Sequence, residues 1–227
     1  QHFFEPWPKH VRTITTDTIK KLSPTMTLST STRKTMKAVV TLGTGDFGQL
    51  SYQDVPLPQP LVGEVLIQVL ASSVNNTDIN TRLGWYSPDV TGSTQILATQ
   101  TSEGAGNSST RGWSAATPFP LIQGTDCCGR VVQLGLGCDP ALLGRRVMVR
   151  PCMRPNGFTS ADNRWLGSDM DGAFADFVKV PVAEVFPVQS SLSDAALGCV
   201  PCAYGTAENM LVQGRVHAGQ HVVVTGA

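Results

Sequence analysis

Between residues 36 and 187 the chain is divided into short apolar segments, each closed within a few residues by glycine, proline or polar turn residues. Segments rich in Val, Ile and Leu with such boundaries are typical of β-strands. Many short strands at close spacing indicate a barrel or a sandwich. The predicted strands are MKAVVTL, LSYQDVPLP, EVLIQVLASSV, GRVVQLG, RRVMVRP, AFADFVKVP and EVFPV.

One segment in this series, NNTDINTRLG, predicts a short helix. Asn76 or Thr77 can cap its start, Asp78 suits its first turn, and Gly84 suits its end. The following residues 87–117 are rich in Ser, Thr and Gly, and a structureless loop of this length is unusual inside a compact domain. We expect a surface insertion there, either mobile or forming a lid.

The pattern changes after Pro187. The segment SLSDAALGCVPCAYGTAENMLVQG predicts two helices, with Ser193 as the first N-cap, a break at Pro201 and an end near Gly214. The segment HVVVTGA then predicts a buried strand followed by a glycine turn. Helix, buried strand and glycine are the way an α/β nucleotide-binding domain begins.

Composition excludes several classes of function. The chain has 17 Lys and Arg against 17 Asp and Glu and no basic cluster, so we expect no nucleic-acid partner and no membrane surface as partner. Its apolar runs are too short for a membrane span. The N-terminal segment has no apolar signal-peptide region, which favours a cytoplasmic protein. Its basic, Ser- and Thr-rich character leaves mitochondrial import as an alternative. The chain begins with Gln1, and Met26 and Met36 are alternative starts.

The six cysteines are too sparse for a disulfide framework and are expected as free thiols. Cys199 and Cys202 have the spacing of zinc and redox motifs. No second pair of ligands accompanies them, and a proline interrupts the helix between them. We interpret them as two small buried residues.

Five motifs, in order, carry a family resemblance. They are SSVNNTDINTRLGWY, FPLIQGTDCCGRVVQLG, GRRVMV, DGAFADFVKVP and SLSDAALGCVPCAYGTAENML. Over residues 36–227 the chain resembles the medium-chain dehydrogenase/reductases. The resemblance implies an α+β fold: a GroES-like, mostly antiparallel β-barrel, then helices and the first strand of a truncated Rossmann domain. It implies two parts within these residues: the GroES-like substrate domain (36–187) and the start of the NAD(P)-binding domain (188–227). Residues 1–35 are polar and aperiodic, and we expect them to be a disordered extension.

The resemblance also bears on zinc. The three catalytic zinc ligands of the family's alcohol dehydrogenases correspond here to Asn75, Thr125 and Cys202. Only the last is a ligand that zinc prefers. The family's run of four structural cysteines is replaced by PCMRPNGFTSADNRWLGSDMD. We therefore expect the zinc-independent, quinone-reductase-like branch, with no metal site.

Site residues carry over from the same resemblance. Asn75 and Tyr86 would line the substrate pocket, and Thr77 occupies the position of a proton-relay hydroxyl. With Asn75, Thr206 would contact the cofactor at its nicotinamide, and Gly226 would be the first glycine of the phosphate-binding turn. Tyr86 has an alternative role as a packed loop anchor.

The other assignments have structural alternatives as well. Asn75 and Thr77 can simply cap the predicted helix, and Thr206 can cap the second helix of the pair. Of two carboxylates at family positions, Asp78 is expected to bind backbone amides. For Asp126, orienting a pocket group and binding an arginine both stay open.

The predicted function is an NAD(P)H-dependent oxidoreductase that reduces a quinone, an enone or another small carbonyl compound without zinc. Family habit favours NADP(H) over NAD(H), and the full-length protein is expected to be a homodimer. Two alternatives are a zinc-type alcohol dehydrogenase with aberrant ligands and a non-catalytic protein of the same fold. As a gene fragment without the cofactor domain, the chain alone is expected to be inactive and not to bind NADPH.

Overall fold

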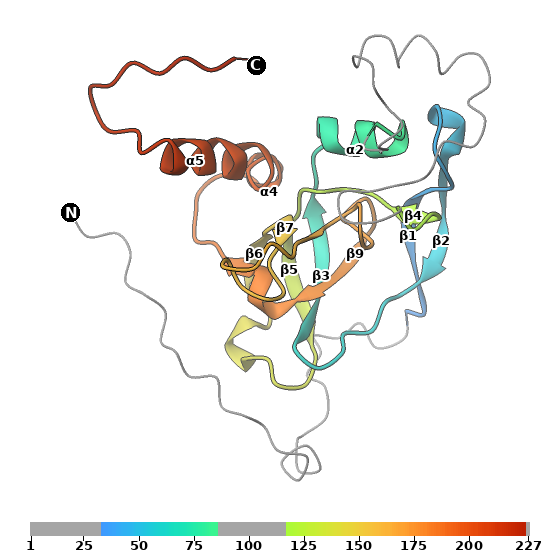
Figure 1. Cartoon of the computed structure of the whole chain (residues 1–227). Coiled ribbons are helices and arrows are strands. Elements are labelled where there is room, and N and C mark those ends of the chain that lie inside the picture. Colours follow the sequence, from blue (N-terminus) through green and yellow to red (C-terminus); the bar gives the residue numbers. More distant parts are fainter. Residues whose placement is uncertain (1–32, 86–116, 226–227) are drawn as a thin grey trace.

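The computed structural model describes residues 33–85 and 117–225 (Figure 1). Most of the predicted disordered extension (1–35) and of the predicted insertion (87–117) lies outside these residues, as do Tyr86 and Gly226. Predictions about them stay predictions.

The strands of the described chain form two antiparallel sheets and a hairpin. One sheet has the strand order β10-β6-β5-β3-β9, the second has the order β2-β1-β4, and β7 pairs with β8. Their bounds are β1 (Thr35–Thr41), β2 (Leu50–Pro56), β3 (Glu64–Ala71), β4 (Leu121–Ile122), β5 (Cys128–Leu134), β6 (Arg146–Val149), β7 (Cys152–Met153), β8 (Arg164–Trp165), β9 (Phe177–Pro181) and β10 (Val185–Pro187). The mostly antiparallel β architecture predicted from the sequence is confirmed.

Strand β3 is central to the packing because both of its faces are buried over Val65–Ile67. Ile67 lies between Val131 of β5 and Val178 of β9, and all three belong to one core cluster. Leu66, on the opposite face, packs in a second core cluster with Met36 and other residues of β1. This position explains why EVLIQV is a nearly continuous apolar run, since only a strand covered on both sides gains from burying every residue.

The two sheets are joined where β1 approaches the segment before β9. Val39 donates its backbone N–H to the carbonyl of Phe174 at 2.8 Å, and Ala38 forms an isolated antiparallel bridge with Ala175. Strand β9 therefore begins at Phe177, four residues later than the predicted start at Ala173. The intervening backbone groups bind the other sheet and a neighbouring loop instead.

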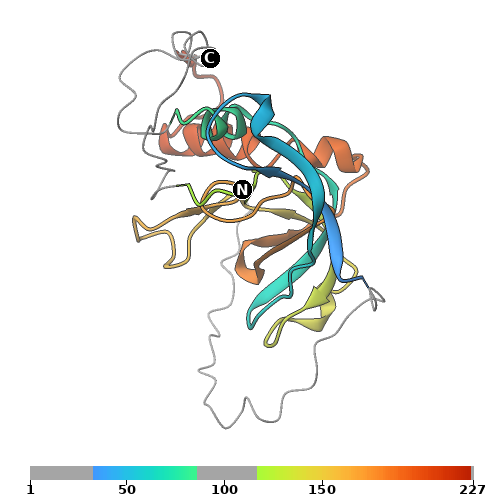
Figure 2. The ribbon, with the colours of Figure 1, turned by 90° about the vertical axis from the view of Figure 1, so that its right-hand side faces the viewer.

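Three α-helices lie at one end of the sheets (Figures 1 and 2). They are α2 (Asn76–Arg82), α4 (Asp194–Gly198) and α5 (Ala203–Gln213), and three short 3-10 turns are η1 (Phe47–Gln49), η2 (Pro140–Leu142) and η3 (Val182–Glu184). Ser193 is the N-cap of α4, as predicted, and its hydroxyl accepts the N–H of Ala196 at 3.2 Å.

The caps of α2 and α5 test two of the predictions. The N-cap of α2 is Asn75, as its alternative role predicted, and not Asn76 or Thr77, because Asp78 accepts the Asn75 N–H and closes the first turn from that residue. The predicted cap of α5 is wrong. The N-cap of α5 is Cys202 and not Thr206. Thr206 lies inside the helix, where its hydroxyl donates to the Cys202 carbonyl at 2.8 Å.

The predicted strand HVVVTGA is also wrong for its described residues. Residues 221–225 belong to no sheet, and the side chain of Val223 is 88% exposed. A parallel strand is stable when neighbouring strands pair with it and helices cover it. No described strand lies beside these valines, and they run away from the sheets (Figure 1).

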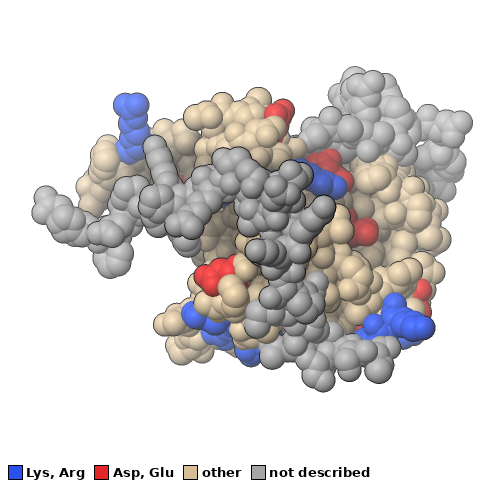
Figure 3. Space-filling model, turned by 90° about the horizontal axis from the view of Figure 1, so that it is seen from below, with Lys and Arg blue, Asp and Glu red and all other residues tan. Residues whose placement is uncertain are grey.

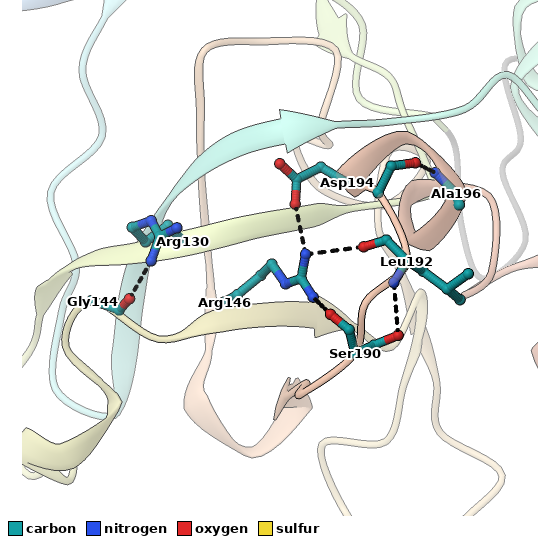
Figure 4. A network of polar contacts seen from close by, with 8 residues as sticks. Arg130, Gly144, Arg146, Ser190, Leu192, Asp194 and Ala196 are labelled. Atoms are coloured by element: carbon teal, nitrogen blue, oxygen red, sulfur yellow. Dashed lines mark hydrogen bonds and ion pairs between the residues drawn. The ribbon is translucent and has the colours of Figure 1, made fainter.

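Arg146 of β6 fastens the linker that leads to α4 (Figure 4). Its guanidinium donates to the backbone carbonyls of Ser190 and Leu192, the latter at 3.1 Å, and to the Asp194 carboxylate at 3.2 Å. Planar guanidinium groups suit such multiple, directional contacts. The contacts fix where the helical segment leaves the sheet.

The charged residues of the described surface form no broad area of one sign in the view from below. Small groups of Lys and Arg alternate there with small groups of Asp and Glu (Figure 3). Among the described residues, every helix is too short or too polar to cross a bilayer.

The first prediction concerns the doubly buried strand. Leu66→Ala should lower the free energy of unfolding by about 2–5 kcal/mol, because it leaves a cavity in the second core cluster. The matched control is Leu61→Ala, since the Leu61 side chain is 64% exposed, and it should change stability by less than about 0.5 kcal/mol. Urea denaturation measures both. Equal effects of the two substitutions would contradict the central place of β3.

Candidate functional site

The helical end of the sheets brings together three separate parts of the chain. These are the loop after β3 together with the start of α2, the loop between β4 and β5, and the start of α5. Five side chains meet there, and we call them the Asp126 cluster: Ser73, Asn75, Thr77, Asp126 and Cys202.

Asp126 lies at the centre and is fully buried. Its Oδ2 accepts the hydroxyl of Ser73 and, at 3.0 Å, the amide Nδ2 of Asn75. Its Oδ1 accepts the backbone N–H of Cys202 at 2.7 Å. None of the ion pairs found among the described residues includes Asp126. Of the two roles left open for this carboxylate, orientation of a neighbouring group fits the structure and arginine binding does not.

Asp78 of α2 binds the loop that precedes Asp126 and the residue that precedes α2. Its Oδ1 accepts the N–H of Gly124 at 3.2 Å and both the N–H and the hydroxyl of Thr125, at 3.1 and 3.0 Å. Its Oδ2 accepts the Asn75 N–H at 2.8 Å. The prediction that Asp78 binds backbone amides is confirmed. Burial raises the pKa of Asp78, while these hydrogen bonds act in the opposite direction.

Gly124 allows this close approach. Its φ is +105°, a conformation that favours glycine, and a Cβ at this position would lie 2.6 Å from the backbone nitrogen of Phe174. The loop can therefore turn its amides toward Asp78 while it packs directly on the segment that precedes β9.

Thr77 and Cys202 face each other across the gap between α2 and α5. The Thr77 Oγ1 lies 4.0 Å from the Cys202 Sγ, at the limit of a weak hydrogen bond. Burial, and then the nearby Asp126 carboxylate, raise the pKa of the Cys202 thiol. A raised thiol pKa disfavours the thiolate, which is both the nucleophile and the metal-binding form of cysteine.

The donors present do not suit a zinc ion. Asn75 gives its amide nitrogen to Asp126, and Thr125 gives its hydroxyl to Asp78. Together with the Cys202 thiol, they are the residues at the positions of the resembled family's ligands. Zinc sites are built from thiolates, imidazoles and carboxylates. No group of three or more such residues close enough to hold a metal occurs in the described ranges.

The predicted site residues thus separate into three groups. Asn75 and Thr77 lie in the cluster. Thr206 is exposed one turn along α5, and its hydroxyl is bound to a carbonyl. Tyr86 and Gly226 lie outside the described residues. Sequence reasoning missed Ser73, whose only signal was its place two residues before Asn75 in a loop after a strand.

A cleft of about 810 Å³ lies elsewhere, between the three-stranded sheet and β9. Met36, Val55, Ile122 and Phe177 are among the residues that line it. None of its lining residues belongs to the Asp126 cluster, so the cleft and the cluster are separate features.

Comparisons with known proteins bear on the fold and the family. Residues 62–190 match the family described as the alcohol dehydrogenase GroES-like domain. Among solved structures, a putative alcohol dehydrogenase from Sinorhizobium meliloti 1021 is 38% identical, with a TM-score of 0.70. The similarity covers 87% of this chain and 52% of that one.

Two curated relatives are more distant. An NAD-dependent alcohol dehydrogenase of Sulfurisphaera tokodaii is 25% identical over 187 residues, which are 78% of this chain and 48% of the relative. An L-threonine 3-dehydrogenase of Pyrococcus horikoshii is 26% identical over 201 residues, which are 85% of this chain and 49% of the relative. The chain therefore spans about half the length of the curated relatives that it matches.

The second prediction follows from the raised pKa of Asp78. The folded protein holds the Asp78 proton more tightly than the unfolded chain, so the wild type should lose stability as the pH rises from the ordinary aspartate value of 3.8 through the raised pKa. Asp78→Asn cannot titrate and lacks this component. The difference in unfolding free energy, wild type minus variant, should fall across this window in urea titrations at several pH values. A difference that stays constant or rises would refute the assignment.

Proposed function

Because the chain belongs to the family of the alcohol dehydrogenase GroES-like domain, we propose that it forms the substrate side of a nicotinamide-dependent oxidoreductase. The proposed substrate is a small quinone, enone or other carbonyl compound. The proposed division keeps residues 36–187 as the substrate domain and residues 188–227 as the start of the cofactor domain.

The observation that carries the proposal is the meeting of α2 and α5 at the Asp126 cluster. Thr77 from one helix and Cys202 from the other lie within 4.0 Å of each other, although 125 positions separate them in the sequence. The Asp126 carboxylate binds the Cys202 N–H directly, and on the Thr77 side it binds the amide of Asn75, the N-cap residue of α2. Active sites commonly join such preorganised polar groups from different elements.

Within this site Thr77 is the proposed hydrogen-bond donor. A nicotinamide cofactor, when bound, supplies the hydride. The Thr77 hydroxyl donates to the carbonyl oxygen of the substrate and stabilises the negative charge that develops there. The amide nitrogen of Asn75 points to Asp126, so Asn75 serves the reaction by holding the start of α2. Tyr86 is the second proposed substrate contact.

We also propose that the reaction is independent of zinc. Support comes from the amide, hydroxyl and high-pKa thiol at the three positions where zinc ligands would be needed. Polarisation of the carbonyl then falls to neutral hydrogen-bond donors.

The cofactor proposal is the least specific. The relative from S. tokodaii is described as NAD-dependent. This favours NAD(H), whereas the sequence-based expectation was NADP(H). Thr206 and Gly226 are kept as proposed contacts of the nicotinamide and the pyrophosphate. A homodimer in the cytoplasm completes the proposal.

The function is tested by an activity assay on protein expressed from the complete gene. Oxidation of NADH and NADPH is followed with quinones, enones and aldehydes as acceptors. Turnover with at least one of these classes is expected. Cofactor binding without turnover of any of them would favour a non-catalytic role.

The third prediction concerns Thr77. Thr77→Val should lower kcat roughly 100-fold or more, because it removes the proposed donor to the substrate oxygen. The matched control is Thr81→Val, one turn further along α2. The Thr81 Oγ1 is buried and has no hydrogen-bond partner in the structure, so its removal should leave kcat unchanged. Equal kinetics for the two variants would remove Thr77 from the mechanism.

The fourth prediction concerns metal content. The purified protein should contain no stoichiometric zinc, and treatment with a chelator should leave its activity unchanged. Elemental analysis and the assay measure these two properties. One zinc ion per chain that is lost in Cys202→Ser would instead establish a zinc-type dehydrogenase with an unusual ligand set.

A further inference from the structure

The buried carboxylate of Asp126 takes part in no chemical step of the mechanism just described. It is completely inaccessible to solvent, and the donors that bind it are neutral. Transfer of a carboxylate from water into a protein interior costs free energy unless hydrogen bonds replace its hydration. Here a hydroxyl, an amide and a backbone N–H replace it.

The two oxygens of this carboxylate serve two different elements. Oδ2 binds Ser73 and Asn75, which lie at the entrance to α2. Oδ1 binds the N–H of Cys202, the N-cap residue of α5. One rigid carboxylate group, only a few ångströms across, therefore sets the spacing between the two helix starts.

This spacing matters most for Thr77. Thr77 is the second residue of α2, and its hydroxyl faces the Cys202 sulfur. α5 has no buried side chain, so few packing contacts hold its first turn in place. The hydrogen bond from the Cys202 N–H to Asp126 holds this turn in place instead. The placement matters because a displacement of about 1 Å at a reacting group can cost on the order of 100-fold in rate.

Building on the proposed function, we propose that Asp126 is a positioning residue of this site. It touches no substrate. It holds the starts of α2 and α5 together through Asn75 and Cys202, so that the Thr77 hydroxyl stays aimed at the substrate oxygen. Asn75, which binds Asp126 directly, is a positioning residue as well.

The test is Asp126→Asn in protein expressed from the complete gene. The variant keeps the size of the side chain but can set an NH₂ group against the Asn75 amide, which is also a donor. The control is Asp171→Asn. Asp171 also accepts a backbone N–H, that of Ile122 at 3.0 Å, but it lies outside the cluster.

Two readouts separate positioning from general stability. In the kinetic readout, kcat of Asp126→Asn should fall roughly 10- to 100-fold while KM changes by less than about threefold, because substrate still binds but meets a misplaced donor. In the structural readout, amide hydrogen exchange should accelerate in peptides from residues 73–82. It should stay unchanged in peptides from β3 and β5. Asp171→Asn should show neither change.

The possible results are distinct. An active wild type with unchanged kcat in Asp126→Asn overturns the inference and leaves the proposed function intact. A variant that loses activity only in proportion to its loss of folded protein also overturns it. An inactive wild type contradicts the proposed function instead. In that case hydrogen exchange alone tests whether Asp126 holds the two helix starts together. Unchanged exchange in residues 73–82 of Asp126→Asn would show that it does not.

Discussion

One buried carboxylate, that of Asp126, holds together the segments that meet at the helical end of this structure. Asp126 sits on the loop that leads into β5, and it accepts hydrogen bonds from the loop after β3 and from the start of α5. Because every partner is neutral, the attraction is shared among three donors and is not concentrated in one ion pair. Such networks are sensitive to geometry, since a donor that moves leaves part of a buried charge without a partner.

The sheets provide the rigid base that this network needs. β3 is buried on both faces, and the loop after it carries Ser73 and Asn75. Asp78 then ties α2 back to Gly124 and Thr125, which precede Asp126 directly. The two carboxylates therefore support the same region in different ways. Asp78 binds α2 to the loop before β5, and Asp126 binds that loop to the start of α5.

Much of this fold could be predicted from the sequence, and the exceptions have physical reasons. The apolar pattern of the long strands predicts them directly. β4, β7 and β8 have only two residues each, which is too short to show a periodicity. The valines at 222–224 look like a buried strand because apolar composition reports a preference for burial. Whether strands lie beside them is a tertiary property. Likewise, the sequence singled out Asp126, Asn75 and Cys202 but not the hydrogen bonds between them, because these bonds join positions 51 to 76 residues apart.

The contacts of Arg146 have a consequence for how the linker can evolve. Two of its three partners are backbone carbonyls, those of Ser190 and Leu192, and only the third is a side chain. The arginine therefore recognises the path of the main chain and is largely indifferent to the residues along it. Substitutions in this linker can accumulate with little loss, provided that its length and direction are kept. A single insertion there would shift the helices at once.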